Sequence, residues 1–423
     1  MNPEPSTFNV QLDKLTYGGD AMGRLPDGRA VFVPFGLPGE HVRVRLTMEK
    51  QNFARGEVVE IIEPSPDRIV PRCEHFAACG GCHYQHLPYS KQLTAKAEIL
   101  RDQLTRIGKI QNPPVAPTVV SPNEWNYRNH VQFHLTETGK LGYVNASGNA
   151  VIDIAECHLP ESAINELWPQ LEFDPGAEIE RVSLRAGVDG DILLALESDS
   201  PEPPELELEA GISVTHIYED HTVVLAGDDH IFIRVLDRDF KVSAPSFFQV
   251  NTPMAEKMVE HLLSALPVSA GDTLLDLYCG AGLFTAFFAP RAGRVLGIES
   301  SPSACEDFVV NLDEFENVEL YEGSAEEILP ELVAQVSDSL APPARAGVRY
   351  AIVDPPRAGL ERRVLDALVA LQPRLIAYVS CDPSTLARDA KRLIEGGYAL
   401  KQVTPFDLFP QTYHIESISI FER

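Results

Sequence analysis

The chain has 423 residues, a length natural for two or three domains, because domains usually span about 100–200 residues. Hydrophobic residues make up 44% and charged residues 23%, a composition typical of a globular protein that buries its core without disulfides. No uninterrupted apolar run reaches about 18 residues, and the first residues lack the basic and apolar regions of a signal peptide. We therefore expect a cytoplasmic protein that does not contact a membrane. The net charge of −27, taken over the whole chain, argues against nucleic acid as a partner.

The charge is distributed unevenly along the chain. Residues 1–130 carry a net charge of +1, residues 131–240 carry −18 and residues 241–423 carry −10. Part of the acidity lies in the proline- and glutamate-rich run 197–209, which is typical of a solvated loop. The N-terminal third is therefore nearly neutral, and it stays available to a polyanionic partner.

The first 65 residues have the pattern of a small β-barrel. Strand-like runs at 31–33, 40–46 and 57–62 are separated by glycine-containing turns. The sequence Pro64-Ser65-Pro66 then breaks the pattern, so we place a domain boundary after residue 65.

From residue 241 onward, strands and helices alternate. Helical stretches separate five apolar runs, at 273–277, 294–298, 318–322, 350–353 and 375–379. This alternation predicts parallel βαβ units in a doubly wound α/β sheet. The runs 398–406 and 414–421 leave no room for a helix between them, so they should form an antiparallel pair at the sheet edge. Residues 66–240 then form a central domain.

A glycine turn after the first of these strands is a candidate cofactor site. Gly280-Ala281-Gly282 lets the backbone approach a ligand, and Glu299, at the end of the next strand, can accept both hydrogens of a ribose diol. The position of a third dinucleotide-binding glycine holds Thr285, which disfavours a pyrophosphate cofactor. A nucleoside without phosphate, such as S-adenosylmethionine, fits better. A tight turn without a ligand is the alternative.

Three candidate reactive side chains lie where strands of the predicted sheet end or begin. Asp354 and Cys381 follow successive strands, and Glu416 lies in the last one. Cys381 also begins a predicted helix, 383–395, whose N-terminus favours the nucleophilic thiolate. A thiolate that adds to carbon 6 of uracil makes carbon 5 nucleophilic toward a methyl group, and a base must then remove the carbon-5 proton. We expect Cys381 to be the nucleophile and Glu416 the base. His414 shares the strand face of Glu416 by the period of two, and it is equally well explained as a packing residue.

Four further cysteines form a candidate metal or cluster site. Cys73, Cys79 and Cys82 lie within ten residues, and Cys157 is a distant fourth. In a reducing compartment this spacing indicates a metal or a cluster rather than disulfides. Four thiolates suit a [4Fe-4S] cluster or structural zinc, and nearby histidines keep zinc open.

Four motifs together resemble, in order, the signatures of one enzyme family. They are Asp276-Leu-Tyr-Cys-Gly-Ala-Gly282, Asp354-Pro-Pro-Arg-Ala-Gly359, Tyr378-Val-Ser-Cys381 and Phe409-Pro-Gln-Thr-Tyr-His-Ile-Glu416. The chain resembles the RNA (uracil-5-)-methyltransferases that carry an N-terminal TRAM domain and a [4Fe-4S] cluster. The resemblance implies an OB-like TRAM barrel over 1–65, a central α+β domain with the iron–sulfur cysteines over 66–240, and a class I (Rossmann-like) methyltransferase domain over 241–423.

The same resemblance assigns roles to individual residues. It implies that S-adenosylmethionine is bound by Gln249, Tyr278, Gly280, Glu299 and Asp354. It implies that Phe247 stacks on the target base, that Arg128 touches RNA, and that the cluster is held by Cys73, Cys79, Cys82 and Cys157. One position departs from the family, which usually has Asn after the catalytic cysteine. Asp382 stands there in this chain, and its negative charge would raise the pKa of Cys381.

The resemblance also implies a partner. We expect a monomer that methylates a uridine of 23S ribosomal RNA, with the tRNA T-loop uridine as the alternative substrate. An iron–sulfur redox RNA-modifying enzyme and an inactive RNA-binding protein are the other two classes, and the presence of both Cys381 and Glu416 argues against inactivity. The acidic middle should face away from RNA, and the RNA face should contain Lys14, Arg24, Arg43, Arg45, Arg55, Arg68, Arg72 and Arg128.

Overall fold

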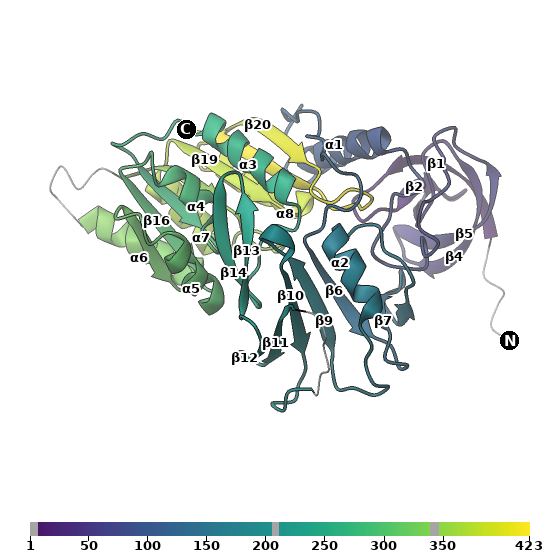
Figure 1. The fold of residues 1–423 in the computed structure, drawn as a ribbon. Helices are drawn as coiled ribbons and strands as arrows, with labels where there is room; N and C mark the ends of the chain where they lie inside the picture. Colours follow the sequence, from purple (N-terminus) through teal and green to yellow (C-terminus); the bar gives the residue numbers. More distant parts are fainter. Residues whose placement is uncertain (1–6, 205–210, 339–346) are drawn as a thin grey trace.

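The computed structural model describes residues 7–204, 211–338 and 347–423. Three parts follow one another across the molecule (Figure 1). A closed barrel lies at one end, a mixed sheet in the middle, and a sheet covered by helices at the other end. Among the described residues, no helix is long and apolar enough to cross a membrane.

The N-terminal part is the small barrel that the sequence predicts. Its strands close in the order β1-β2-β3-β5-β4. In β4, side chains alternate, with Val42 and Val44 inside and Arg43 and Arg45 outside, as expected for a strand with one buried face. The strands are β1 (Thr7–Leu15), β2 (Ala21–Arg24), β3 (Ala30–Val33), β4 (His41–Glu49) and β5 (Phe53–Glu63).

The middle part is a seven-stranded sheet in the order β12-β11-β10-β9-β6-β7-β8. Phe133 on β6 packs against Trp168, next to the short helix α2 (Ser162–Leu167). Glu197 ends β10 and pairs with Arg181, and the expected acidic loop after it lies partly outside the described residues. The strands are β6 (His130–Leu135), β7 (Leu141–Val144), β8 (Val151–Asp153), β9 (Arg181–Ala186), β10 (Ile192–Glu197), β11 (Ser213–Tyr218) and β12 (His221–Ala226).

Two segments of the middle part pack on the last part. Helix α1 (Tyr89–Arg106) lies against α8 and β20 of the C-terminal sheet. The hairpin β13 (His230–Val235) and β14 (Arg238–Ser243) lies against α3 and α5. Strand β14 therefore runs through residue 240, where the sequence places a domain boundary.

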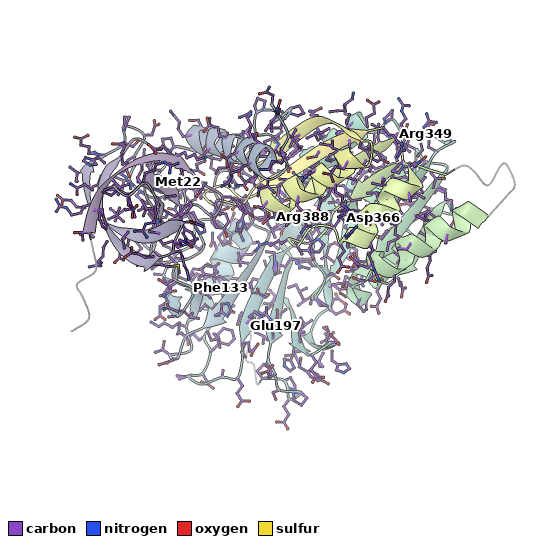
Figure 2. All side chains as sticks on the ribbon, turned by 180° about the vertical axis from the view of Figure 1, so that it is seen from behind. Met22, Phe133, Glu197, Arg349, Asp366 and Arg388 are labelled. Carbon is purple, nitrogen blue, oxygen red and sulfur yellow. The ribbon has the colours of Figure 1, made fainter. Side chains whose placement is uncertain are left out.

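The last part is a second seven-stranded sheet in the order β17-β16-β15-β18-β19-β21-β20. Its first five strands are parallel, and β20 and β21 form the antiparallel pair predicted at the edge. The strands are β15 (Thr273–Leu277), β16 (Arg294–Glu299), β17 (Val318–Glu322), β18 (Val348–Val353), β19 (Leu375–Ser380), β20 (Ala399–Phe406) and β21 (Glu416–Glu422). The helices are α3 (Thr252–Ala265), α4 (Leu283–Phe288), α5 (Pro302–Asn311), α6 (Ala325–Asp338), α7 (Arg362–Leu371) and α8 (Pro383–Glu395). Figure 2 shows Glu197 on the middle sheet and Arg388 on α8, in different parts of the molecule.

Several strand boundaries differ from the predicted ranges, and one of these differences bears on the candidate site. The last strand begins at Glu416, whereas the alternation of apolar residues predicts that it begins at His414. His414 belongs to the turn before the strand, so the period of two does not fix the direction of its side chain relative to Glu416.

Candidate active site

The register of the C-terminal sheet brings Cys381 and Glu416 together. Ser380, the last residue of β19, pairs with Ser417 of β21 in the antiparallel ladder. One further step in the same register places Cys381 opposite Glu416, and residues directly opposite have Cα atoms about 4.5–5.5 Å apart. Asp354 follows β18, the other neighbour of β19, and Val353 just before it pairs with Tyr378. The three candidate side chains therefore meet at the end of the sheet where strands β18 and β19 finish and β21 begins.

The surroundings of Cys381 favour the thiol over the thiolate. Burial raises the pKa of Cys381 to about 12, and the charges of Glu416, Asp354 and Asp382 act in the same direction. Arg357, an exposed residue after β18, opposes them. The net shift of the Cys381 pKa is therefore opposite to the lowering expected from the helix N-terminus alone.

Asp382 is one of the groups that oppose activation of Cys381 at the start of helix α8. Its carboxylate is the N-cap of α8 and accepts hydrogen bonds from the amides of Ser384 at 2.8 Å and Thr385 at 3.0 Å. These amides are the source of the positive partial charge at a helix N-terminus. Asp382 accepts from these amides and adds its own negative charge, which raises the pKa of the neighbouring Cys381 thiol, although burial is the largest cause. The sequence-based concern about Asp382 thus agrees with the direction of the shift.

Glu416 is a buried carboxyl. Burial and the charge of Asp354 raise its pKa well above the usual range, while Arg357 and Lys96 act against them. His414 is neutral, because burial and nearby cations lower its pKa to about 3. Its ring packs against Phe409 and Tyr413, which fits the packing role.

The glycine turn is built as a ligand-binding turn requires. Gly282 has a φ of +88° and begins α4, and a Cβ there would lie 2.8 Å from the Leu312 side chain. Glu299 lies under the turn, where its Oε2 accepts from the amide of Gly280 at 3.0 Å. Thr285 occupies the third-glycine position because its hydroxyl donates to the buried Asp276 at 2.6 Å. The sequence motif included Asp276 but did not reveal this role.

Carboxyl groups gather on the cofactor side of the site. Burial raises the pKa of Asp276 and of Asp354 to about 7 each, and Glu299 acts on both in the same direction. A positively charged ligand in this place would relieve their mutual repulsion. Of the other expected cofactor contacts, Tyr278 has a φ of +62° and donates its hydroxyl hydrogen to Glu326 at 3.0 Å. Gln249 is half-buried, and its carbonyl accepts from the side chain of Asn129 at 3.0 Å.

Phe247 and Arg128 differ in their accessibility. Phe247 is 71% exposed, whereas the adjacent Phe248 is buried against Phe240. An aromatic ring with this exposure is free to stack on a base. The side chain of Arg128 is half-buried, and its guanidinium lies 5.4 Å from the centre of the Phe409 ring.

The four cysteines are free and half-buried. They lie close enough for their charges to interact, since Cys79 raises the pKa of both Cys82 and Cys157, and Cys73 raises that of Cys79. Within the described ranges, however, no three His, Cys, Asp or Glu side chains are grouped closely enough to hold a metal ion. The expected iron–sulfur site is therefore not shown.

The positive charge of the barrel is largely neutralised by carboxylates. Five of the eight cations expected on the RNA face form ion pairs: Lys14 with Asp102, Arg43 with Glu60, Arg45 with Glu57, Arg55 with Asp20, and Arg68 with Glu40. The barrel also touches the candidate active site, because the Tyr17 hydroxyl donates to Asp382 at 2.9 Å. No local pattern marks this contact between residues 365 positions apart.

Comparison with known proteins decides the family. A tRNA (uracil-5-)-methyltransferase model matches residues 220–423, and a TRAM domain model matches residues 4–59. An RNA methyltransferase of Aquifex aeolicus is 34% identical over 445 residues, covering 98% of each chain. An RNA methyltransferase of Thermosynechococcus vestitus is 32% identical over 453 residues, again covering 98% of each chain. The chain belongs to the tRNA (uracil-5-)-methyltransferase family. It is an RNA methyltransferase with an N-terminal TRAM domain, as the motifs predict.

A solved structure supports the fold of the whole chain. The tRNA (uracil-54, C5)-methyltransferase of Pyrococcus abyssi, in complex with S-adenosyl-L-homocysteine, matches with a TM-score of 0.73 and 26% identity. The match covers 98% of this chain and all of that one. The predicted methyltransferase fold with a small N-terminal barrel is thereby confirmed, and S-adenosylmethionine is the methyl donor of the family.

Proposed function

We propose that the protein methylates carbon 5 of a uridine in RNA, with Cys381 as the nucleophile and Glu416 as the base. The observation that carries this proposal is the meeting of Cys381, Glu416 and Asp354 at this end of the sheet, beside the glycine turn. A half-buried thiol opposite a buried carboxyl suits a reaction that needs a nucleophile first and a base afterwards.

The chemical steps follow from these positions. Cys381 gives its proton to water, and its sulfur adds to carbon 6 of the uracil, which places negative charge on carbon 5 and the carbonyl oxygen. S-adenosylmethionine, when bound, supplies the methyl group and a positive sulfonium charge beside Asp354 and Glu299. Carbon 5 bonds to the methyl carbon as the bond between that carbon and the sulfonium sulfur breaks, which leaves S-adenosyl-L-homocysteine. The Glu416 carboxylate then takes the carbon-5 proton. The sulfur–carbon 6 bond then breaks, the ring double bond is restored, and Cys381 leaves as the thiolate.

The raised pKa of Cys381 links this reaction to cofactor binding. In the protein alone, three carboxylates disfavour the thiolate. Arg357 opposes them, and positive charge bound beside Asp354 would act in the same direction as Arg357. Burial remains the largest cause of the raised pKa, and cofactor binding should increase the thiolate fraction of Cys381 by offsetting the charge of Asp354.

We assign the recognition of the flipped base to Phe247 and Arg128. The exposure of Phe247 supports stacking on a uracil taken out of its helix, an arrangement that base-modifying enzymes require. Arg128, which stacks on Phe409 in the loop before Glu416, would contact the RNA at the same place.

We also propose that Cys73, Cys79, Cys82 and Cys157 hold a [4Fe-4S] cluster with a structural role. Two observations support this assignment. The half-buried thiols lie near enough for Cys157 and Cys79 to raise the pKa of Cys82, beyond the larger effect of burial. The amide of Gly81 donates a hydrogen bond to the sulfur of Cys79 at 3.3 Å. Anaerobic purification with iron and sulfide analysis tests this assignment. A colourless protein with one zinc ion would refute it.

Two RNAs are candidate substrates in the cytoplasm. The resemblance of the TRAM and cysteine arrangement favours 23S ribosomal RNA, whereas the full-length similarity to the Pyrococcus abyssi enzyme favours tRNA. Labelled S-adenosylmethionine should be incubated with each RNA from cells that lack the activity, and the methylated nucleoside should be mapped. Cys381→Ala should abolish incorporation, while Cys305→Ala, which changes a buried cysteine of α5, should retain it. Full incorporation by Cys381→Ala would refute the mechanism.

A further inference from the structure

A buried ion pair lies beneath the loop that leads to Glu416. The Lys96 ammonium, on helix α1, lies 2.5 Å from Asp407 Oδ1, and both side chains are fully buried. Lys96 also donates to the carbonyl of Phe409 at 2.9 Å. A buried ion pair contributes little net stability because both charges lose their hydration. Stability alone therefore does not explain this lysine.

The pair is adjacent to Glu416 through the sheet. Asp407 directly follows Phe406, and Phe406 is the cross-strand partner of Glu416 in the ladder of β20 and β21. Lys96, on α1 outside the sheet, lies near enough to Glu416 for the two charges to interact. Burial lowers the pKa of Lys96, and Asp407 and Glu416 act against that shift and favour the ammonium.

Helix α1 and neighbouring segments together fix the loop between β20 and Glu416. Each backbone carbonyl from Leu408 to Gln411 accepts a hydrogen bond from a residue outside the loop. The donors are the side chains of Asn251, Lys96 and Tyr127, and the amides of His83 and Tyr84. Gln92, one turn before Lys96, makes two side-chain bonds to Gln411, at 2.9 Å and 3.0 Å. The loop is therefore held in one position relative to α1.

We propose that Lys96 is a positioning residue for Glu416: its ammonium, fixed by Asp407 and the Phe409 carbonyl, favours the carboxylate form that takes the carbon-5 proton. The proposal rests on the proposed function of Glu416. In the step concerned, the carbon-5 proton moves to Glu416, the bond from carbon 6 to Cys381 breaks, and the Cys381 thiolate is released.

The other groups around Glu416 disfavour its carboxylate form, so a nearby cation is needed to favour that form. Asp354, from the loop after β18, and Cys381, after β19, both disfavour a second negative charge. Arg357 is the only other cation that acts on Glu416 among the described residues, and it is exposed. His414 contributes no charge, because its pKa is lowered to about 3.

Single-turnover kinetics separate the two halves of the reaction. With methyl-labelled S-adenosylmethionine, excess enzyme and the RNA substrate, label bound to protein on a denaturing gel reports the methylated adduct, and label in free RNA reports its release. In Lys96→Met the adduct should form at the wild-type rate. Release should be about tenfold slower at pH 7, the effect of one pKa unit, and should recover as the pH rises. Equal slowing of both steps with no change in pH profile would overturn the proposal.

A double variant separates the effect of the lost Lys96 charge on Glu416 from the loss of stability that an unpaired Asp407 causes. Lys96→Met with Asp407→Leu removes both charges, so that no uncompensated carboxylate remains buried, and it should recover the thermal stability that Lys96→Met loses. Its release should stay slow with the shifted pH profile. Release at the wild-type rate would show that Lys96 only neutralises Asp407, which refutes the proposal. Lys91→Met, on the exposed face of the same helix, is the matched control and should behave as wild type. If the wild type forms no methylated adduct at all, the proposed function fails instead.

Discussion

Replacing Asp382 by Asn should make Cys381 more reactive without weakening helix α8. The Asp382 carboxylate lies next to the thiol, accepts from the amides of Ser384 and Thr385, and accepts from the Tyr17 hydroxyl. Asn caps helices about as well as Asp, so the cap persists while the charge is lost. Two charges 4 Å apart interact by about 1 kcal/mol in water and about 4 kcal/mol at an effective dielectric constant of 20. Asp382 is half-exposed, so we take about 1.4 kcal/mol, which is one pKa unit.

This shift sets the size of the expected effect. At a pH well below 12, a pKa lower by one unit gives about ten times more thiolate, and the lower nucleophilicity of that thiolate leaves the alkylation rate about threefold higher. The assay is iodoacetamide labelling of the Cys381 peptide, followed by mass spectrometry between pH 7 and 10. Asp382→Ala is the contrast, because it also loses the cap and should cost about 1 kcal/mol or more of stability. An unchanged alkylation profile in Asp382→Asn would refute the contribution of the Asp382 charge to the raised pKa of Cys381.

Two further substitutions test other parts of the site. Phe247→Ala should leave thermal stability almost unchanged because the ring is exposed, yet weaken RNA binding by about 1–3 kcal/mol through lost base stacking, as measured by filter binding. Phe248→Ala, the buried neighbour, should instead cost about 3–5 kcal/mol of stability, and the reverse pattern would contradict the stacking role. Gly282→Ala should cost about 1–2 kcal/mol for the left-handed backbone and lower the affinity for S-adenosylmethionine in calorimetry. Unaltered affinity there would show that the turn does not contact the cofactor.

Much of the fold could be predicted because it is encoded locally. Strands β15 and β17 and helix α8 begin and end where the sequence places them, since apolar runs, glycine turns and an Asp-Pro helix start are signals within a few residues. The sequence predicts that β21 begins at His414, two residues before its observed start at Glu416. Alternation of apolar residues continues through His414, but the turn that ends at Ile415 is held by bonds to distant segments.

Parts of the site could not be predicted because they depend on distant contacts. Cys381 and Glu416 were found through their motifs, but the raised pKa of Cys381 arises from burial and from carboxylates on three segments. The helix N-terminus alone predicts a lowered pKa, and the charge of Asp382 predicts a raised one, but the burial that decides the direction is not visible in the sequence. Lys96 lies more than 300 positions from the loop that it supports, and no local pattern marks it.

The most direct test of the central claim, that Cys381 adds to the uracil and Glu416 completes the reaction, uses Glu416→Gln. This variant should transfer methyl from labelled S-adenosylmethionine and then stop, because the adduct can form but cannot eliminate. The label should therefore migrate with a protein–RNA complex on a denaturing gel, and the complex should disappear when Cys381→Ala is added. Label found only in free RNA at the wild-type rate, or a complex that persists without Cys381, would contradict the account.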